Sequence, residues 1–545
     1  DAGRLLALPP VRRPWVEPLA PVVGLGAVLD RLPPGSLTDD PGRVAVLGLV
    51  DDPENQAQHV ATVDLEASGG LLAFGTGGSG KTTLLRTVAA GLASQGSPDE
   101  VQLCGLDFAS RALDAVADLP HCSDIVPGDD PERVTRLLTV LGREVEARRT
   151  LLSEERVETL GALRARRGEP VLPRIVLLLD SYHGFHGAFD RSDGYQWLTA
   201  LQQLVSRGRQ VGIHSVITTE RRLGVPSALL AAVSARLALR MATPEDLTAL
   251  GVPLRVAKGA ELPNGRGFLG GTAEVQVACV SDDPSGAAQS QALSDAGAKM
   301  TAAEASRAPQ LPTLPERIVF PGPTTRPLTS PFGVTDLTLE PADVDLTRQN
   351  LVVTGAPMSG KSCALETVAW GLRASTPALQ MLALGSAASP LATLDVWDDA
   401  AFSRAAHGPL VGRLTDLMAG DESIEARAVL FVDAAEDLEG NDVLRPLEAL
   451  LRSDALRAVV ACEPTTIAKA YSGWLAALRR NRSAIMLQPE SRQDVEAAVG
   501  VKPALRPGQH FPPGRGIFVA NRQWSLVQVG LRPAGGAANQ GGVAH

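Results

Sequence analysis

Residues 70–92 read GLLAFGTGGSGKTTLLRTVAAGL, and residues 350–372 read NLVVTGAPMSGKSCALETVAWGL. Each stretch opens on a short apolar strand (LLAF, LVVT), passes through a loop that contains glycine, and continues into a helical segment. Such a loop lets backbone N–H groups converge on a phosphate, and the helix N-terminus adds its partial positive charge. The two stretches therefore predict two phosphate-binding sites on a scaffold of alternating strands and helices.

Both loops fit the pattern GxxxxGK[ST] of the nucleotide-binding P-loop. In that motif the lysine, here Lys81 or Lys361, reaches the β- and γ-phosphates, and the hydroxyl of Thr82 or Ser362 ligates Mg²⁺. A glycine-rich turn can match by accident, but two aligned copies in the same context make that reading negligible. We expect ATP and Mg²⁺ as cofactors. The predicted nucleotide-binding residues are Gly75, Thr76, Gly77, Gly78, Ser79, Gly80, Lys81, Thr82, Thr83, Gly355, Ala356, Pro357, Met358, Ser359, Gly360, Lys361, Ser362 and Cys363.

The similarity between the two stretches continues along the chain, and five correspondences in one order indicate two copies of one domain. After the loops, the matching segments are RIVLLLD (174–180) with AVLFVD (428–433), GIHSVITTE (212–220) with LRAVVACE (456–463), ARLALRMATPED (235–246) with NRSAIMLQPESRQD (481–494), and LPNGRGFL (262–269) with FPPGRGIF (511–518).

Alternating strands and helices predict, for each copy, a mainly parallel sheet flanked by helices. The fold class is therefore α/β, with two tandem RecA-like P-loop NTPase domains. We expect the first domain over 1–290, including a Pro-rich N-terminal flank, and the second over 317–530. The small, polar stretch between them predicts a linker over 291–316, and residues 531–545 predict a flexible tail.

The chain has 545 residues, of which 44% are apolar, and a formal net charge of −10. These values are typical of folded globular protein, and no apolar run approaches the roughly 18 residues of a membrane helix. The acidic balance argues against a surface that wraps nucleic acid, although a basic ring lumen is compatible with it. Five widely spaced cysteines are typical of reduced intracellular thiols. The chain opens Asp-Ala-Gly without Met, and we expect a fragment that lacks an N-terminal portion.

A carboxylate at the end of a neighbouring strand completes the magnesium site in P-loop proteins, and Asp180 and Asp433 stand at that place. The alternative for both is an ordinary strand-end cap. A hydrolysing ATPase of this type normally carries Glu next, but Ser181 and Ala434 follow here, and neither is a general base at neutral pH. Glu436 is an imperfect substitute in the second copy. Hydrolysis is therefore doubtful, and the sequence predicts a protein that binds ATP better than it cleaves it.

Other residues are further candidates for the nucleotide sites or for a contact between subunits. Thr219 ends a strand where it could reach a γ-phosphate, and Cys462 in the corresponding place would do so poorly. Arg207 and Arg209 are either arginine fingers for a neighbouring subunit or surface residues.

Two histidines and two arginines are also notable in the sequence. His121 and His214 lie beside apolar segments and are expected to be structural. Arg266 and Arg515, in the paired GRG turns, either face solvent or act at a subunit contact.

With these motifs the chain resembles the FtsK/SpoIIIE class of motor ATPases. The segment GRQVGIHSVITTER (208–221) is similar to that class's sensor strand, with Glu220 where those proteins carry Gln. Within the class, PWVEPLAPVVGL (14–25), LDFASRALDAVADLPHCSDIVPGDDPERVTRLL (106–138) and the GRG turns look like EccC, the membrane-anchored ATPase of type VII (ESX) secretion.

The resemblance implies a cytoplasmic chain tethered to the inner face of the cell membrane through a region absent from this chain. The EccC family has three tandem ATPase domains, of which these two look like the second and third. In that family most hydrolysis is assigned to the first, and the last binds the export signal of WXG-type (EsxB-like) secreted proteins. Residues 317–530 would then hold the receptor surface. Other membrane components of the secretion system and a homo-oligomeric ring are further expected partners, and DNA is not.

The function that fits best is the ATP-binding portion of a type VII secretion motor that recognises exported proteins, with weak or no hydrolysis. One alternative is an FtsK-like DNA translocase, which predicts DNA binding that falls steeply with salt. The other is a non-hydrolysing scaffold that uses ATP to lock its domains.

Overall fold

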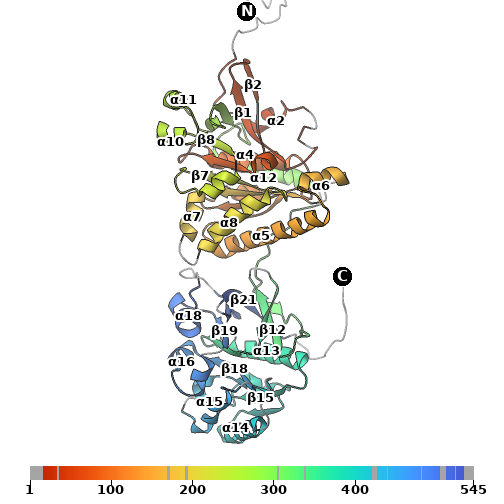
Figure 1. Cartoon of the computed structure of the whole chain (residues 1–545), viewed down its shortest axis with the longest axis vertical. Helices are drawn as coiled ribbons and strands as arrows, with labels where there is room; N and C mark the ends of the chain where they lie inside the picture. Colours follow the sequence, from red (N-terminus) through yellow and green to blue (C-terminus); the bar gives the residue numbers. More distant parts are fainter. Residues whose placement is uncertain are drawn as a thin grey trace, which may run out of the picture. The chain divides into compact units, whose positions relative to one another are not determined.

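The computed structural model describes residues 16–33, 36–37, 39–168, 172–190, 194–303, 306–336, 339–419, 426–438, 440–453, 455–479, 482–503, 511–521 and 523–532. The chain divides into two compact units, Asp1–Leu311 and Pro312–His545, and each is described by itself (Figure 1). The expected tail lies, from residue 533 onward, outside the described residues, and so does the N-terminal flank up to residue 15.

The segment expected as a linker, 291–316, is divided between the two units. Most of helix α12 (Gly286–Ala303) falls in it, and Leu293 of that helix is fully buried in a core of the first unit. Ala308 and Leu311 are also buried, whereas Pro312 begins the second unit. A short helix was compatible with the predicted linker, but its packing into the first unit was not predicted, because its small residues form no strongly apolar stripe.

One sheet forms the centre of the first unit, and in the described residues its strand order is β2-β1-β10-β9-β8-β3-β7-β6-β4-β5. Neighbours from β8 through to β5 are parallel, and those from β8 through to β2 are antiparallel. The strands are β1 (Val44–Asp52), β2 (Ala57–Asp64), β3 (Leu71–Phe74), β4 (Val101–Asp107), β5 (Cys122–Pro127), β6 (Arg174–Asp180), β7 (Ile213–Thr219), β8 (Ala235–Leu239), β9 (Arg266–Leu269) and β10 (Ala273–Val277).

Helices cover both faces of this sheet, with α4 and α12 on one face and α5, α7 and α8 on the other (Figure 1). The strand before the P-loop shows why two cores form: Leu71 and Ala73 point into one core, and Leu72 and Phe74 into the other. Apart from α12, the helices of this unit are α2 (Leu25–Leu29), α3 (Leu65–Ser68), α4 (Lys81–Ala93), α5 (Pro131–Glu154), α6 (Leu160–Arg167), α7 (Tyr182–Phe189), α8 (Tyr195–Gly208), α9 (Ser227–Ala232), α10 (Pro244–Ala249) and α11 (Leu254–Gly259).

The second unit repeats this architecture strand for strand, in the order β13-β12-β21-β20-β19-β14-β18-β17-β15-β16 over the described residues. A short strand, β11 (Ile318–Val319), adds to β21 in parallel. The identical order confirms the duplication predicted from sequence. The other strands are β12 (Thr329–Thr335), β13 (Pro341–Asp345), β14 (Asn350–Gly355), β15 (Gln380–Leu384), β16 (Asp399–Ala401), β17 (Ala428–Val432), β18 (Leu456–Cys462), β19 (Arg482–Leu487), β20 (Arg515–Ala520) and β21 (Gln523–Leu531).

The predicted fold class is therefore confirmed: each unit is a mixed α/β domain in which a mainly parallel sheet lies between helices. In the second unit the helices are α13 (Lys361–Ser375), α14 (Arg404–Met418), α15 (Pro446–Leu450), α16 (Pro464–Lys469), α17 (Gly473–Leu478) and α18 (Arg492–Val499), with a 3₁₀ turn at Ala435–Leu438. Because parallel strands end at one edge of a sheet, the loops after β3, β6 and β7 meet there, and so do those after β14, β17 and β18.

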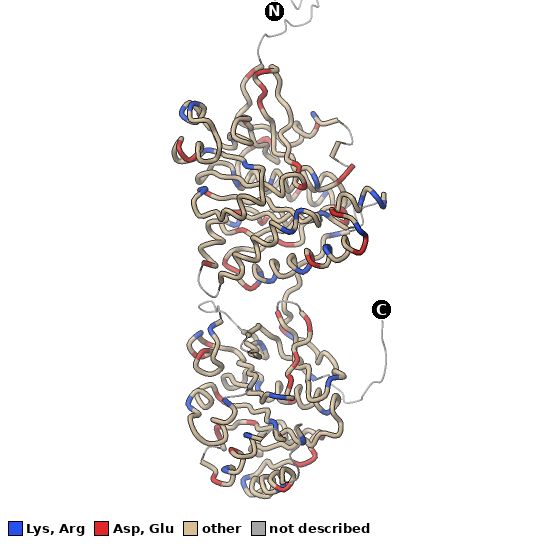
Figure 2. The backbone as a smooth tube through the Cα atoms, in the orientation of Figure 1, with Lys and Arg blue, Asp and Glu red and all other residues tan. Residues whose placement is uncertain are grey.

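Acidic and basic side chains are interspersed along both units (Figure 2). Among the described residues, no helix has both the length and the apolar character that crossing a bilayer requires.

Candidate functional site

The first P-loop, between β3 and α4, wraps around its own lysine. Nζ of Lys81 donates hydrogen bonds to the carbonyl oxygens of Gly75, at 2.7 Å, and Thr76, at 2.9 Å. The loop can close this tightly because Gly78 and Gly80 have φ angles of 69° and 103°, which favour glycine. Burial lowers the pKa of Lys81, against the charges of nearby carboxylates. The ammonium group is thus held at the mouth of the loop, where a phosphate would meet it.

The hydroxyl and carboxylate predicted to hold magnesium lie together. Oγ1 of Thr82 donates to Oδ2 of Asp180 at 2.6 Å, and Oγ1 of Thr218 donates to Oδ1 at 2.6 Å. Asp180 is buried, and burial raises its pKa, while the two hydrogen bonds and the charge of Lys81 act in the opposite direction. A hydroxyl beside a carboxylate is a pair of hard oxygen ligands, so this arrangement fits Mg²⁺.

The residue that follows Asp180 turns the chain. Ser181 has a φ of 68°, and its hydroxyl accepts a hydrogen bond from the backbone N–H of Gly184 at 3.1 Å, which caps α7. In the second unit Ala434 has a φ of 52° at the matching position. Neither side chain supplies a carboxylate where a hydrolysing ATPase has its base.

The hydroxyl of Thr219, which was expected to reach a γ-phosphate, donates to the carbonyl of Arg221 at 3.4 Å. The preceding residue, Thr218, is the one that contacts Asp180. The pairing of β6 with β7 explains this, because Leu179 lies opposite Ile217 and so places Asp180 beside Thr218. Strand register, which a single sequence does not display, is the signal that would have identified Thr218.

A cavity of about 630 Å³ lies over the first P-loop. Its lining includes the charged residues Lys81, Asp180 and Glu220 together with several apolar side chains. The lining comprises Pro21, Val22, Gly77, Gly78, Gly80, Lys81, Thr82, Thr83, Phe108, Ala109, Ser110, Asp180, Ser181, Glu220, Pro263, Asn264, Gly265, Gln276, Val277, Cys279 and Pro284.

The second P-loop, between β14 and α13, has the same internal bonds. Nζ of Lys361 donates to the carbonyls of Gly355, at 2.8 Å, and Ala356, at 3.1 Å. The Ser362 hydroxyl lies 3.2 Å from Oδ2 of Asp433. The two predicted magnesium-binding groups therefore meet in this unit as well.

A different residue completes the second carboxylate site. Val432 lies opposite Val460 in the pairing of β17 with β18, which places Ala461 beside Asp433, and alanine has no hydroxyl to donate. Oγ of Ser389, from the loop after β15, donates to Oδ2 of Asp433 at 2.6 Å instead. Sequence comparison of the two copies did not predict Ser389, because it comes from a different loop.

Glu436 lies between the ends of β17 and β18. Its Oε2 accepts a hydrogen bond from the backbone N–H of Glu463 at 3.1 Å, and it is close enough to Lys361 for that charge to act on it. Burial raises the pKa of Glu436, which its hydrogen bonds and Lys361 oppose. Cys462 is fully buried at the end of β18.

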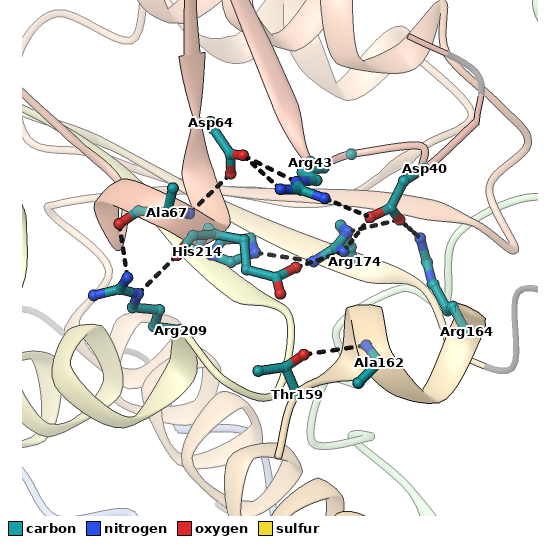
Figure 3. Close-up of polar contacts among 12 residues, drawn as sticks. Asp40, Arg43, Asp64, Ala67, Thr159, Ala162, Arg164, Arg174, Arg209 and His214 are labelled. Atoms are coloured by element: carbon teal, nitrogen blue, oxygen red, sulfur yellow. Dashed lines mark hydrogen bonds and ion pairs between the residues drawn. The ribbon is translucent and has the colours of Figure 1, made fainter. Parts of the chain in front are cut away.

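Arg207 and Arg209, the candidate arginine fingers, form an ion pair and hydrogen bonds within the first unit. Nε and Nη2 of Arg209 donate to the carbonyls of Glu66 and Ala67, both at 2.7 Å (Figure 3). Nη1 of Arg207 lies 3.1 Å from Oε1 of Glu146. His121 is buried with its Nε2 2.7 Å from the carbonyl of Gly96, which agrees with a structural role.

The arginines of the GRG turns, expected to face solvent or a subunit contact, form hydrogen bonds within their own chain. Arg266 is buried, and its Nη2 donates to the carbonyls of Leu19, at 2.6 Å, and Ala20, at 3.3 Å. Nη2 of Arg515 donates to the carbonyls of Leu314 and Pro315, both at 2.7 Å. Each arginine thus holds the segment that leads into its own unit.

A second polar cluster lies at the amino ends of β6 and β7, away from the P-loop (Figure 3). Arg174 is fully buried between Asp40, at 2.6 Å, and Glu66, at 2.7 Å, and its Nη1 is 3.5 Å from Nε2 of His214. Burial would raise the pKa of Asp40, but Arg174 and Arg164 lower it overall. The pKa of His214 falls to about 3, through burial and the charge of Arg174. These charges satisfy one another, so the cluster is structural.

Residues 43–272 match the FtsK/SpoIIIE family. The chain is 26% identical over 378 residues to the ESX-1 secretion system protein EccCb1 of Mycobacterium tuberculosis, a match that covers 65% of this chain and 61% of that protein. It is 25% identical over 248 residues to the type VII secretion system protein EssC of Staphylococcus aureus, which covers 45% of this chain and 16% of EssC. The match thus spans about three fifths of the mycobacterial relative's length.

The fold is that of solved EccC structures. ATPases 2 and 3 of EccC from Thermomonospora curvata, solved in complex with a signal sequence peptide, match 95% of this chain and 100% of that one, with a TM-score of 0.82 and 22% identity. The cytoplasmic domain of the same EccC matches 97% of this chain and 66% of that one, with a TM-score of 0.83 and 23% identity. Residues 43–272 thus match the FtsK/SpoIIIE family, and the chain is similar in sequence to EccCb1 and EssC and in fold to EccC.

Proposed function

We propose that this chain binds Mg·ATP at both P-loops and forms the second and third ATPase domains of a type VII secretion motor. The observation that carries the proposal is the repeated geometry of lysine, hydroxyl and aspartate: Lys81, Thr82 and Asp180 in one unit, and their counterparts in the other. Thr82 with Asp180, and Ser362 with Asp433, would hold Mg²⁺. When bound, the metal supplies charge neutralisation for the phosphates.

Hydrolysis in these two domains is weak or absent. Ser181 and Ala434 occupy the place of the base, and both have positive φ angles that serve the turn after the strand. Bound nucleotide then acts mainly as a ligand that stabilises each unit.

Counting the nucleotide bound per chain tests both the proposed ATP binding and the proposed weak hydrolysis. The purified chain is incubated with Mg·ATP for hours, freed of unbound nucleotide and denatured, and the released ATP and ADP are counted. We expect close to two ATP per chain, and about half of that after Lys81→Ala or Lys361→Ala. Unchanged occupancy in these variants contradicts the site assignment, and accumulating ADP that disappears on mutating Asp180 or Asp433 contradicts weak hydrolysis.

The second unit, over 317–530, is proposed to bind the export signal of WXG-type (EsxB-like) secreted proteins. Support comes from the related EccC fragment, which was solved with a signal sequence peptide. A photo-crosslinking peptide with such a signal should label the second unit of the full chain. Labelling confined to the first unit contradicts this placement.

The chain is further proposed to act on the cytoplasmic face of the cell membrane with membrane components of the secretion system, in a homo-oligomer. Both relatives are named as type VII or ESX-1 secretion proteins. DNA is not proposed as a ligand, because charges of both signs are interspersed along the described residues (Figure 2). A salt-sensitive rise in fluorescence anisotropy of labelled duplex DNA on adding the chain would favour a translocase instead.

A further inference from the structure

The cavity over the first P-loop is lined by residues from both sides of β3 in the sheet: Asp180 ends β6 and Glu220 follows β7, whereas Pro263 precedes β9 and Val277 ends β10. The charged residues of the lining include Lys81, Asp180 and Glu220. Pro21, Val22, Pro263, Val277, Cys279 and Pro284 contribute apolar lining. A cavity of about 630 Å³ has the size of a nucleotide site, so it has room for more than the phosphates.

The proposed ATP site fixes which part of a nucleotide each side of the cavity would meet. The triphosphate belongs at the loop, because the lysine and the α4 N-terminus are there. The γ-phosphate lies toward Asp180, which the Thr82 hydroxyl contacts. The base would then extend toward the β9 and β10 side of the sheet, where Pro21, Val22 and Val277 belong to the lining.

Part of the lining comes from residues 19–24, near the start of the unit, which we call the strap. The backbone N–H of Cys279 donates to the carbonyl of Val23 at 2.8 Å, and Gly24 forms a bridge with Cys279. Arg266 holds the carbonyls of Leu19 and Ala20. The strap is thus bonded on both sides of Pro21 and Val22, which line the cavity.

Arg266, the first residue of β9, directly follows a turn that contacts the P-loop. The backbone N–H of Gly265 donates to the carbonyl of Ser79 at 2.9 Å. A Cβ on Gly80 would approach the Gly265 backbone to 2.9 Å, so the turn and the loop are in close contact. Nε of Arg266 donates to Oε1 of Gln276 at 2.9 Å, which keeps the guanidinium aimed at the strap.

The second unit retains an arginine that bonds the segment entering the sheet, but the residues that follow in that segment differ. Arg515 holds Leu314 and Pro315, and the N–H of Gly514 donates to the carbonyl of Ser359 at 3.0 Å. Counting forward from the clamped carbonyls, Glu316 and Arg317 take the places of Pro21 and Val22. The arginine is thus common to both sites, whereas the apolar pair Pro21 and Val22 belongs to the first.

We propose that Pro21 and Val22, positioned by Arg266, form the base subsite of the first nucleotide site. The proposal rests on the proposed ATP binding and adds a residue set to it. Val22 contacts the base, and Arg266 is a positioning residue that acts through the strap.

The test compares ATP with inorganic tripolyphosphate, which has the phosphates without the base. Both are titrated by calorimetry, with Mg²⁺, into the full chain carrying Lys361→Ala so that only the first site binds. Val22→Asn should weaken ATP binding about fivefold and change tripolyphosphate binding less than twofold. Asn is chosen because it is neutral and does not repel the phosphates.

Arg266→Lys should produce the same selective loss, since one ammonium group cannot reproduce the planar fork that bonds two carbonyls and Gln276. Arg515→Lys is the matched control and should leave the first site unchanged. Equal weakening of both ligands, or of neither, overturns the base subsite. If the Lys361→Ala parent binds neither ligand, the proposed function itself is overturned, and the subsite falls with it. Retained tripolyphosphate binding also shows that each variant is folded.

Discussion

Met358 occupies in the second P-loop the left-handed backbone position that Gly78 holds in the first, with φ angles of 61° and 69°. Its side chain is 95% exposed and so gains almost nothing from packing. For a residue other than glycine, this backbone conformation is less stable by about 1 kcal/mol. Met358→Gly should therefore raise the free energy of unfolding of the second unit by about 1 kcal/mol. Denaturant melts measure it, and Gly78→Met is the reciprocal control, which should destabilise the first unit.

Glu436 is the one acidic side chain named above that could still act as a base in the second site, since burial raises its pKa while Lys361 lies near. Glu436→Gln should reduce any residual ADP formation at least about tenfold and leave ATP occupancy unchanged. Rapid-quench assays with labelled ATP measure both quantities. Residual turnover that is unaffected by the substitution excludes Glu436 from this role.

His214 makes the first unit sensitive to acid. Its pKa is about 3 in the folded protein, and about 6.5 is normal for an exposed imidazole, so below pH 6.5 the unfolded chain binds a proton that the folded chain does not. Stability is thus fully present above pH 6.5 and falls as the pH is lowered toward 3. At pH 5 the loss should be about 2 kcal/mol. His214→Gln, which can still accept from Arg174, should reduce the loss between pH 7 and pH 5 in calorimetric melts.

At the scale of elements, α12 offers the clearest test of the revised domain boundary. A Cβ on Gly297 would lie 2.3 Å from the backbone oxygen of Asp118, whereas one on Gly286, in the same helix, meets nothing within 4 Å. Gly297→Ala should destabilise the first unit by about 2 kcal/mol, and Gly286→Ala should not. Equal melting temperatures of the two variants would mean that α12 does not pack as described.

The sequence was sufficient for the elements around each P-loop, because apolar strands, glycine loops and the repeat between copies point to the same fold. It failed where tertiary contacts decide. The contact of Thr218 with Asp180 depends on strand register, and Ser389 comes from a loop that the repeat does not match. The sequence indicated only that Arg266 belongs to a turn. Its contacts could not be predicted, because the carbonyls that it binds lie almost 250 residues earlier in the chain.

At the scale of the whole molecule, two nucleotide sites in two units predict two separate responses to ligand. Mg·ATP at about a thousand times its Kd should stabilise each unit by about 4 kcal/mol. Scanning calorimetry should show both unfolding transitions move to higher temperature. Lys81→Ala should remove the shift of the first unit only, and Lys361→Ala that of the second. A single transition that responds to either variant would show that the units unfold as one.

The strap has one more consequence. In the first unit Gly24 pairs with Cys279, and in the second Ile318 pairs with Gly530, so the segment that enters each sheet lies beside the segment that ends it; in the first unit α12 then follows. A domain whose two ends emerge side by side can be joined head to tail with another copy without breaking any backbone bond of either sheet. For the second unit this arrangement predicts that a circularly permuted form, with the ends at β11 and β21 joined and new ends cut in an exposed loop, would still fold.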